Sequence, residues 1–401
     1  IILGVGTALL IAAYCGVKLL NRIQVWIGRR KPQLILCTLS ILCSYLIAEV
    51  LFSLLYINGA IYRPTSAWIF ENSGKTVHFD PVRGYKLSPT PSRFARITEG
   101  TIEYVGTWRG NSQGFPDRDD FSSKRKDPDS LRLTVFGDSF TAAQYIDKNW
   151  PDALEDLDSN SQAPINVELL NFSTDGGGLA NWWSNLTHIL EKERYEVDGI
   201  VFAVFGDDLH RGFSISEHRG YSRHMFAYLK SWNPEDWPKN RQEAQSILKP
   251  LSGYIVTEDE FSKALDGTWH PKLPRPWKPY LFIEAHGKLQ EKIKIINSKF
   301  INRLFVQPES KKSETGQIFS QEQKELIRQI SIFAQINSLP VIVVRIPSRP
   351  ELIEKLPPRE DVLLFSKLLD ATFIDGGEAF SNLTEIEIRS HWLPYDGHWA
   401  Q

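Results

Sequence analysis

The chain has 401 residues, of which 42% are hydrophobic and 23% are charged, and its formal net charge is −2 at pH 7. This composition suits a folded protein with a sizeable core and excludes a disordered chain. A charge so close to zero creates no basic surface field, so we expect no nucleic-acid partner. The three cysteines, Cys15, Cys37 and Cys43, all lie in apolar segments. The rest of the chain therefore has no thiol for a disulfide, a metal site or a nucleophile.

Two apolar runs stand at the beginning of the chain. Residues 1–20 are apolar apart from Thr7, Tyr14 and Lys18, and residues 34–57 contain one ionisable group, Glu49. Each run is long enough to cross a bilayer as a helix, so we predict a two-helix membrane anchor over residues 1–57. Basic residues without acidic ones separate the runs, which places this loop in the cytoplasm and all that follows residue 57 outside. We expect Glu49 to lie in the outer part of its helix, facing another helix.

Residues 58–130 are rich in Pro, Gly, Ser, Arg and Asp, and they predict an irregular stalk with a strand or two. From residue 131 onward, apolar runs alternate with amphipathic stretches. Strands are predicted at 131–136, 165–170, 200–205, 341–346 and 372–375, and helices at 178–194, 321–336 and 361–369. This alternation predicts an α/β domain over residues 131–401, with three α/β/α layers around a parallel sheet.

Residues 211–315 interrupt the alternation and predict an inserted, cap-like region. The insert contains four tryptophans, Trp232, Trp237, Trp269 and Trp277. They could line a substrate groove, or they could pack the insert against the body of the domain. The sequence leaves both alternatives open.

A serine stands where the first strand of this domain ends, in Gly137-Asp138-Ser139. The carboxyl ends of parallel strands are where ligands collect, although the tripeptide taken alone favours a simple turn. A serine becomes a nucleophile when a base removes its proton and a third group orients that base. The segment after the last predicted strand supplies both groups, His398 and Asp396. A turn carboxylate and a surface imidazole are the alternatives there, and His210 and His391 are competing bases.

The segment Asn171–Gly178 follows a strand and precedes a helix. Its glycines allow backbone N–H groups to approach a ligand, so it is a candidate for stabilising an oxyanion. It could also be a flexible loop or a phosphate-binding loop. The spacing fails the dinucleotide fingerprint G-x-G-x-x-G, so we expect no nucleotide cofactor, and no metal site is predicted.

Taken together, these stretches resemble the SGNH/GDSL hydrolase family of esterases and acyltransferases, in particular its membrane-anchored members. The resemblance rests on five segments: Phe79–Tyr85, Asn111–Phe115, Gly137–Thr141, Asn171–Gly178 and Asp396–Trp399. It implies a flavodoxin-like sheet, with Ser139 as nucleophile, His398 as base and Asp396 as its partner. It also implies that Ser139 and Gly176 donate hydrogen bonds to the oxyanion.

One block departs from the family pattern. The segment Phe205–Leu209 has Asp207 where the family has an asparagine that donates to the oxyanion. Two like charges at about 4 Å cost roughly 4 kcal/mol at an effective dielectric near 20, which is close to a thousandfold in rate. Asp207 could be protonated in an apolar pocket, the donor could come from elsewhere, or the domain could be weakened or inactive.

The expected function is a membrane-anchored serine esterase that acts on O-acyl esters through an acyl-serine intermediate, without a cofactor. By analogy with the family, the substrates are acylated carbohydrates of the cell wall or exported glycans, and the location is a bacterial inner membrane with the domain facing the periplasm. The alternatives are an O-acyltransferase with a sugar acceptor, a catalytically silent glycan-binding module, and a phosphate-binding protein that uses the Gly176 loop. Because the sequence begins at Ile1 and ends at Gln401, we expect a fragment at both ends.

Overall fold

The computed structural model describes residues 32–33, 35–57, 66–71, 76–125, 127–161, 165–219, 223–250, 253–269, 281–283, 285–286, 318–393 and 398. The chain divides into two compact units, residues 1–63 with 270–309, and residues 64–269 with 310–401. The predicted insert is therefore shared between the units. The first predicted membrane helix, Trp277 and Asp396 lie outside the described residues.

In the smaller unit, the helix Ile35–Ile57 has a mean hydropathy of 2.2 and is long and apolar enough to cross a membrane. Glu49 is buried on this helix, and its carboxylate accepts hydrogen bonds from the Ser53 hydroxyl at 2.8 Å and the Tyr45 hydroxyl at 3.2 Å. It also accepts from the backbone N–H groups of Leu281 at 2.9 Å and Phe282 at 3.0 Å. The residues 281–283 are helical, so Glu49 faces a second helical segment, as expected from the sequence.

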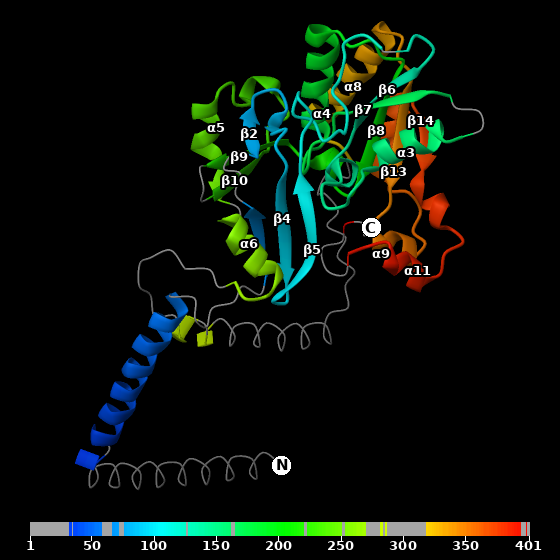
Figure 1. Cartoon of the computed structure of the whole chain (residues 1–401). Helices are drawn as coiled ribbons and strands as arrows, with labels where there is room; N and C mark the ends of the chain where they lie inside the picture. The colour runs from blue at the N-terminus through cyan, green and yellow to red at the C-terminus, as the bar shows by residue number, and fades with distance from the viewer. Residues whose placement is uncertain are drawn as a thin grey trace, which may run out of the picture. The chain divides into compact units, whose positions relative to one another are not determined.

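The larger unit contains a five-stranded parallel sheet in the order β14-β13-β8-β6-β7 (Figure 1). Its strands are β6 (Leu131–Phe136), β7 (Val167–Asn171), β8 (Gly199–Phe205), β13 (Val341–Ile346) and β14 (Thr372–Asp375). The first strand, β6, lies between the second, β7, and the third, β8. This is the flavodoxin-like order, and its topological switch point lies beyond the carboxyl ends of β6 and β8. The predicted α/β class with a parallel sheet is confirmed.

Helices cover both faces of this sheet. On one face, Phe136 and Phe202 pack with Trp182 and Phe365 in a single core cluster. On the other face, Val135 and Val201 pack with Trp150. The residues of these strands are buried on two sides, which explains their apolar runs without polar alternation. The first face is covered by α4 (Leu179–Thr187, continued by a π-helical turn at His188–Glu193), α8 (Gln321–Ile336) and α10 (Glu360–Leu368), and the second by α3 (Trp150–Ser159).

A second sheet stands in the region predicted to be a stalk, so the prediction of an irregular segment is wrong for residues 66–108. Its order is β12-β1-β4-β5, and Phe70, Phe94 and Trp108 are buried on one face while Ile69 and Ala95 are buried on the other. The sequence hid this sheet because turn-forming residues surround its strands, and because β12 comes from a segment far along the chain. The strands are β1 (Ser66–Glu71), β4 (Ser92–Thr98), β5 (Thr101–Trp108) and β12 (Gly253–Val256), and a hairpin is formed by β2 (Val77–Asp80) and β3 (Gly84–Leu87).

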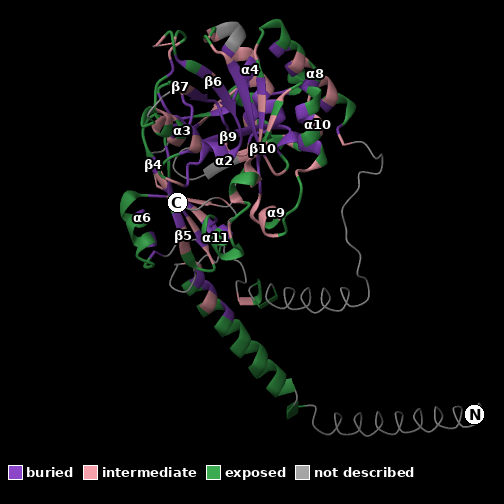
Figure 2. Cartoon of the chain, turned by 90° about the vertical axis from the view of Figure 1, so that its right-hand side faces the viewer, coloured by how far each residue is buried: buried purple, intermediate pink, exposed green. Residues whose placement is uncertain are grey.

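Two tryptophans of the insert belong to core clusters that include residues outside it, Trp237 with Ala180 and Trp269 with Ile69. Trp237 stacks on Phe213 with ring centroids 4.4 Å apart, and Trp269 contacts Tyr254 edge-on at 5.2 Å. Both tryptophans are buried, and this supports packing rather than a groove lining for these two. In Figure 2 buried residues gather on β6 and β7, whereas α6 is largely exposed. The remaining elements are α2 (Ser139–Ala142), β9 (Phe213–Arg219), β10 (Arg223–Leu229), α5 (Arg241–Ile247), β11 (Lys249–Pro250), α6 (Glu258–Leu265), α9 (Arg349–Ile353), α11 (Glu385–Ser390) and 3₁₀ turns at Asp208–His210, Pro234–Asp236 and Gly376–Phe380.

Candidate active site

Ser139 is the first residue of the short helix α2, directly beyond the carboxyl end of β6. The preceding Asp138 caps this helix, because its Oδ1 accepts a hydrogen bond from the Phe140 N–H at 2.9 Å. A Cβ atom at Gly137 would come within 2.2 Å of Thr141 Oγ1, so the tight passage from strand to helix requires glycine there. The local sequence therefore places the serine at the switch point of the sheet.

The imidazole of His398 meets this serine from the other end of the chain. Ser139 Oγ and His398 Nε2 lie 2.8 Å apart. The imidazole packs against the rings of Tyr145 and Phe140, with centroids 4.3 and 4.9 Å away. When His398 Nε2 carries no proton, it can accept the hydroxyl proton, which is the contact that activation of a serine needs. The orienting role of Asp396 stays a prediction, because that residue lies outside the described part of the chain.

The glycine loop after β7 lies against the same strand end. The Thr174 N–H donates to Gly137 O at 3.1 Å, and the Tyr85 hydroxyl donates to Asp175 O at 3.1 Å. Gly176 has a φ of +68°, a conformation that favours glycine. Asp175 lines the cavity beside Ser139, and both Asp175 and Gly176 line the neighbouring cavity. The loop is thus positioned near the serine, and the part of Gly176 as an oxyanion donor stays a prediction.

Asp207 is not held in the apolar environment that a neutral acid would need. Its side chain is 69% exposed, and its Oδ1 lies 2.7 Å from Arg211 Nη2 and 2.8 Å from Arg211 Nε. Among the described residues, those that line the Ser139 cavity do not include Asp207. The option of a protonated Asp207 in an apolar pocket is therefore wrong for this structure, and an ion pair with arginine takes its place.

The sequence reasoning overlooked Arg211, which joins the ends of two strands. Its Nη1 lies 3.1 Å from Asp138 Oδ2 and 2.8 Å from Asp208 Oδ1, and both aspartates are buried. Burial, reinforced by the charge of Asp138, raises the pKa of Asp208 well above its usual range. Burial alone would lower the pKa of Arg211, but the carboxylates of Asp208 and Asp138 outweigh it and raise that pKa. An arginine three and four residues after two aspartates is the sequence signal that could have revealed this cluster.

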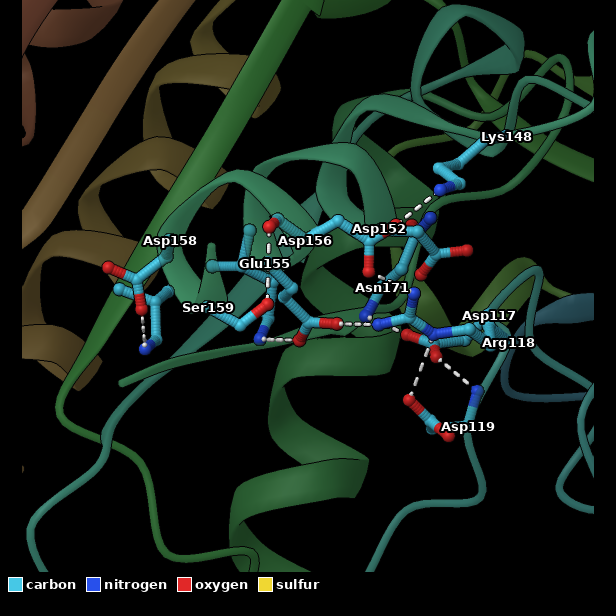
Figure 3. A network of polar contacts seen from close by, with 12 residues as sticks. Asp117, Arg118, Asp119, Lys148, Asp152, Glu155, Asp156, Asp158, Ser159 and Asn171 are labelled. Atoms are coloured by element: carbon cyan, nitrogen blue, oxygen red, sulfur yellow. Dashed lines mark hydrogen bonds and ion pairs between the residues drawn. The ribbon is translucent and has the colours of Figure 1, made fainter. Parts of the chain in front are cut away.

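A polar network supports the strand end beside Ser139 (Figure 3). The side-chain amide of Asn171 donates to Pro116 O at 3.0 Å and to Thr141 O on α2 at 3.3 Å, and its backbone N–H donates to Asp117 Oδ2 at 3.0 Å. Burial raises the pKa of Asp117 to about 8 and that of Glu155 to about 7. Arg118 pairs with Glu155 at 2.8 Å. Asn171 thus serves as a structural support for α2.

No group of three or more His, Cys, Asp or Glu side chains that could hold a metal ion occurs among the described residues. The arrangement around Ser139 is that of a hydroxyl, an imidazole and nearby backbone N–H groups. These are the groups that nucleophilic acyl transfer uses.

Comparison with known proteins yields distant similarities. No family model matches the sequence, and no curated protein matches it. Among solved structures, AlinE4, described as an SGNH-hydrolase family esterase, is similar with a TM-score of 0.30 and 12% identity, over 65% of this chain and 84% of that chain. A mutant of the same esterase has a TM-score of 0.30 and 11% identity over the same shares. With similarity this low, the chemistry of the site follows from its own residues.

Proposed function

We propose that this protein is a serine hydrolase of SGNH type, which cleaves O-acyl esters through an acyl intermediate on Ser139. The observation that supports the proposal is the 2.8 Å contact between Ser139 Oγ and His398 Nε2 at the carboxyl end of β6. The two residues are 259 positions apart, so nothing local in the sequence requires this contact. A turn serine and a surface imidazole would have no reason to meet at a switch point.

The first half of the reaction forms the acyl-enzyme. His398 Nε2 accepts the hydroxyl proton while Ser139 Oγ attacks the ester carbonyl carbon. The tetrahedral intermediate collapses by breaking the bond to the alcohol oxygen, which takes the proton from His398 and leaves. In the second half, His398 removes a proton from water, and the hydroxide attacks the acyl carbon. The bond from that carbon to Ser139 Oγ then breaks, His398 returns the proton to Oγ, and the acid leaves. A sugar hydroxyl in place of water would make the same site an O-acyltransferase.

The negative charge of the intermediate needs hydrogen-bond donors. The backbone N–H groups of Ser139 and Gly176 are the donors that we assign, and each is worth roughly a hundred- to a thousandfold in rate. We assign no donor to Asp207, whose carboxylate is engaged by Arg211. In this proposal Asp396 orients His398 and stabilises its protonated form.

We further propose that the helix Ile35–Ile57 anchors the enzyme in a bacterial inner membrane, with the larger unit on the outer side. Its length and hydropathy support the anchor. Acylated glycans of the cell envelope are the substrate class that such a location brings within reach. The cavity next to Gly176 supports this class, because the hydroxyl-bearing Tyr85, Ser216 and Tyr228 line it together with aromatic rings.

The test is covalent labelling by a fluorophosphonate probe, with the full chain purified in detergent. We expect labelling of the wild type that is lost in Ser139→Ala and falls at least a hundredfold in rate in His398→Ala. The matched control is His391→Ala, since this imidazole is exposed at the end of α11 and contacts Phe380. An unlabelled wild type, or labelling that survives in Ser139→Ala, would refute the proposed enzyme and leave a silent binding module as the alternative.

A further inference from the structure

A cavity of about 100 Å³ opens beside the candidate nucleophile and is lined by both Ser139 and His398. Its opposite wall is aromatic and comes from the second sheet: Trp68 and Phe70 from β1, Phe94 from β4, and Tyr104 and Trp108 from β5. Ser139 stands beyond a strand of the parallel sheet, His398 comes from the C-terminal segment, and the sheet in the predicted stalk supplies the rings that face them. The site is therefore composite.

The aromatic wall is rigid because its rings support one another. Ring centroids lie 5.1 Å apart between Phe70 and Trp108, 5.3 Å between Phe94 and Trp108, and 6.0 Å between Trp68 and Tyr104. Such offset and edge-on pairs stabilise a fixed arrangement of rings. A wall of this kind cannot easily recede to admit a larger group.

A backbone hydrogen bond holds this aromatic wall close to the segment that follows α2. The Thr107 N–H of β5 donates to Gln144 O at 2.9 Å, in the segment that follows α2. A Cβ atom at Gly106 would lie 2.6 Å from the same oxygen, so glycine permits this close approach. The second sheet is thus bonded directly to the segment that carries Ser139.

A second, larger cavity of about 270 Å³ shares Trp68, Trp108 and Asp175 with the first. Both linings are rich in aromatic rings, but the second also contains Gly176 and the hydroxyl-bearing Tyr85, Ser216 and Tyr228. An ester bound at Ser139 has an acyl part and an alcohol part that must enter different spaces. The smaller cavity, which holds Ser139 and His398, matches the hydrocarbon of the acyl part, and the larger one, with hydroxyl groups among its rings, matches a hydroxylated alcohol such as a sugar.

We propose that the small aromatic cavity receives the acyl chain and limits the substrates to esters of short acids, from acetyl to butyryl. This inference rests on the function proposed above. An apolar cavity of about 150 Å³ binds benzene, which has six carbon atoms, so a cavity of this size holds roughly four. Each methylene group beyond the space available costs about 10- to 200-fold in specificity. The aromatic wall of the second sheet thus limits the length of the acyl chain that the site accepts.

The experiment measures the acylation of Ser139 by p-nitrophenyl acetate, butyrate and octanoate, as the first equivalent of p-nitrophenol released. This readout serves for hydrolysis and for transfer alike. For the wild type we expect octanoate to react at least a hundredfold more slowly than butyrate. Trp68→Ala joins the two cavities and raises the octanoate-to-acetate ratio at least tenfold. Ala142→Ile fills the cavity from the α2 side and lowers the butyrate-to-acetate ratio at least tenfold.

The control variant is Trp183→Ala, a half-buried tryptophan of α4 that packs on Phe333 in the main core. It loses an indole of the same size, and we expect its chain-length profile to match the wild type. Octanoate reacting as fast as butyrate in the wild type would overturn the inference, even if neither variant folded, and would leave the proposed function intact. Failure of every ester to acylate Ser139 would refute the proposed function, and the inference with it.

Discussion

The raised pKa of the buried Asp117 carboxyl group predicts how the free energy of unfolding changes with pH. Its pKa is raised from 3.8 to about 8, chiefly by burial, so the folded state keeps a proton that the unfolded state loses above about pH 4. Below about pH 4 this group does not change the free energy of unfolding. Its contribution lowers that free energy as pH rises from about 4 to about 8, and it changes no further above about pH 8. The slope is about 1.4 kcal/mol per pH unit and flattens near the folded-state pKa, so the change is about 2.3 kcal/mol between pH 6 and pH 8. Glu155, raised to about 7, acts in the same direction.

The perturbation that tests this prediction is Asp117→Asn, because an amide has the same shape and does not titrate. Asp117 accepts from the N–H groups of Asp119 and Asn171, one on each oxygen, and the amide loses one of these bonds at a cost of about 1 kcal/mol. By this linkage the wild type has lost about 3 kcal/mol by pH 6 and about 5 kcal/mol by pH 8, so we expect the variant to be more stable by about 2 kcal/mol at pH 6 and by about 4 kcal/mol at pH 8.

The assay is urea unfolding in detergent, followed by tryptophan fluorescence at pH 5.5 to 8.5. The control is Asp129→Asn, which removes an exposed carboxylate from a neighbouring turn. A free energy of unfolding that rises between pH 6 and pH 8 in the wild type, or an Asp117→Asn variant with an unchanged slope, would refute the reasoning.

Three further predictions concern single side chains. Arg211→Met leaves the buried carboxylates of Asp138 and Asp208 uncompensated, and we expect a loss of about 3 to 5 kcal/mol in urea unfolding; a loss below 1 kcal/mol would contradict the ion-pair cluster. Asp207→Asn is expected to raise ester hydrolysis less than tenfold. The Asp207 carboxylate is exposed, and two like charges about 4 Å apart in water repel each other by only about 1 kcal/mol. A thousandfold gain in kcat/KM would mean that the carboxylate does oppose the oxyanion. Glu49→Ala removes the acceptor of two backbone N–H groups, so hydrogen exchange at Leu281 and Phe282 should accelerate at least tenfold, whereas Cys43→Ala, an exposed change on the same helix, should leave it unchanged.

The strands and helices of the parallel sheet could be predicted because the sequence patterns that specify them are short and local. The segments Val341–Ile346, Thr372–Asp375 and Gln321–Ile336 agree with the predicted ranges residue for residue. Central strands must be apolar on both faces, and the helix begins with a capping box of Ser320 and Gln323, so each signal lies within a few residues of the chain. The position of Ser139 at the end of a strand was equally local.

The tertiary structure alone decided what surrounds that serine. The contact between Ser139 and His398, the pairing of Asp138 with Arg211, and the aromatic wall of Trp68 and Trp108 all join segments that no periodicity connects. The second sheet depends on β12, which pairs with β1 from a point far along the chain, so composition in residues 66–108 could not disclose it. Local propensity determines where a strand forms. The packing of the whole unit determines which strand pairs with its edge, and which side chains meet its charged groups and aromatic rings. The sequence by itself thus determined the parallel sheet and the serine at its edge, and the packing of distant segments determined the shape and charge of the site around it.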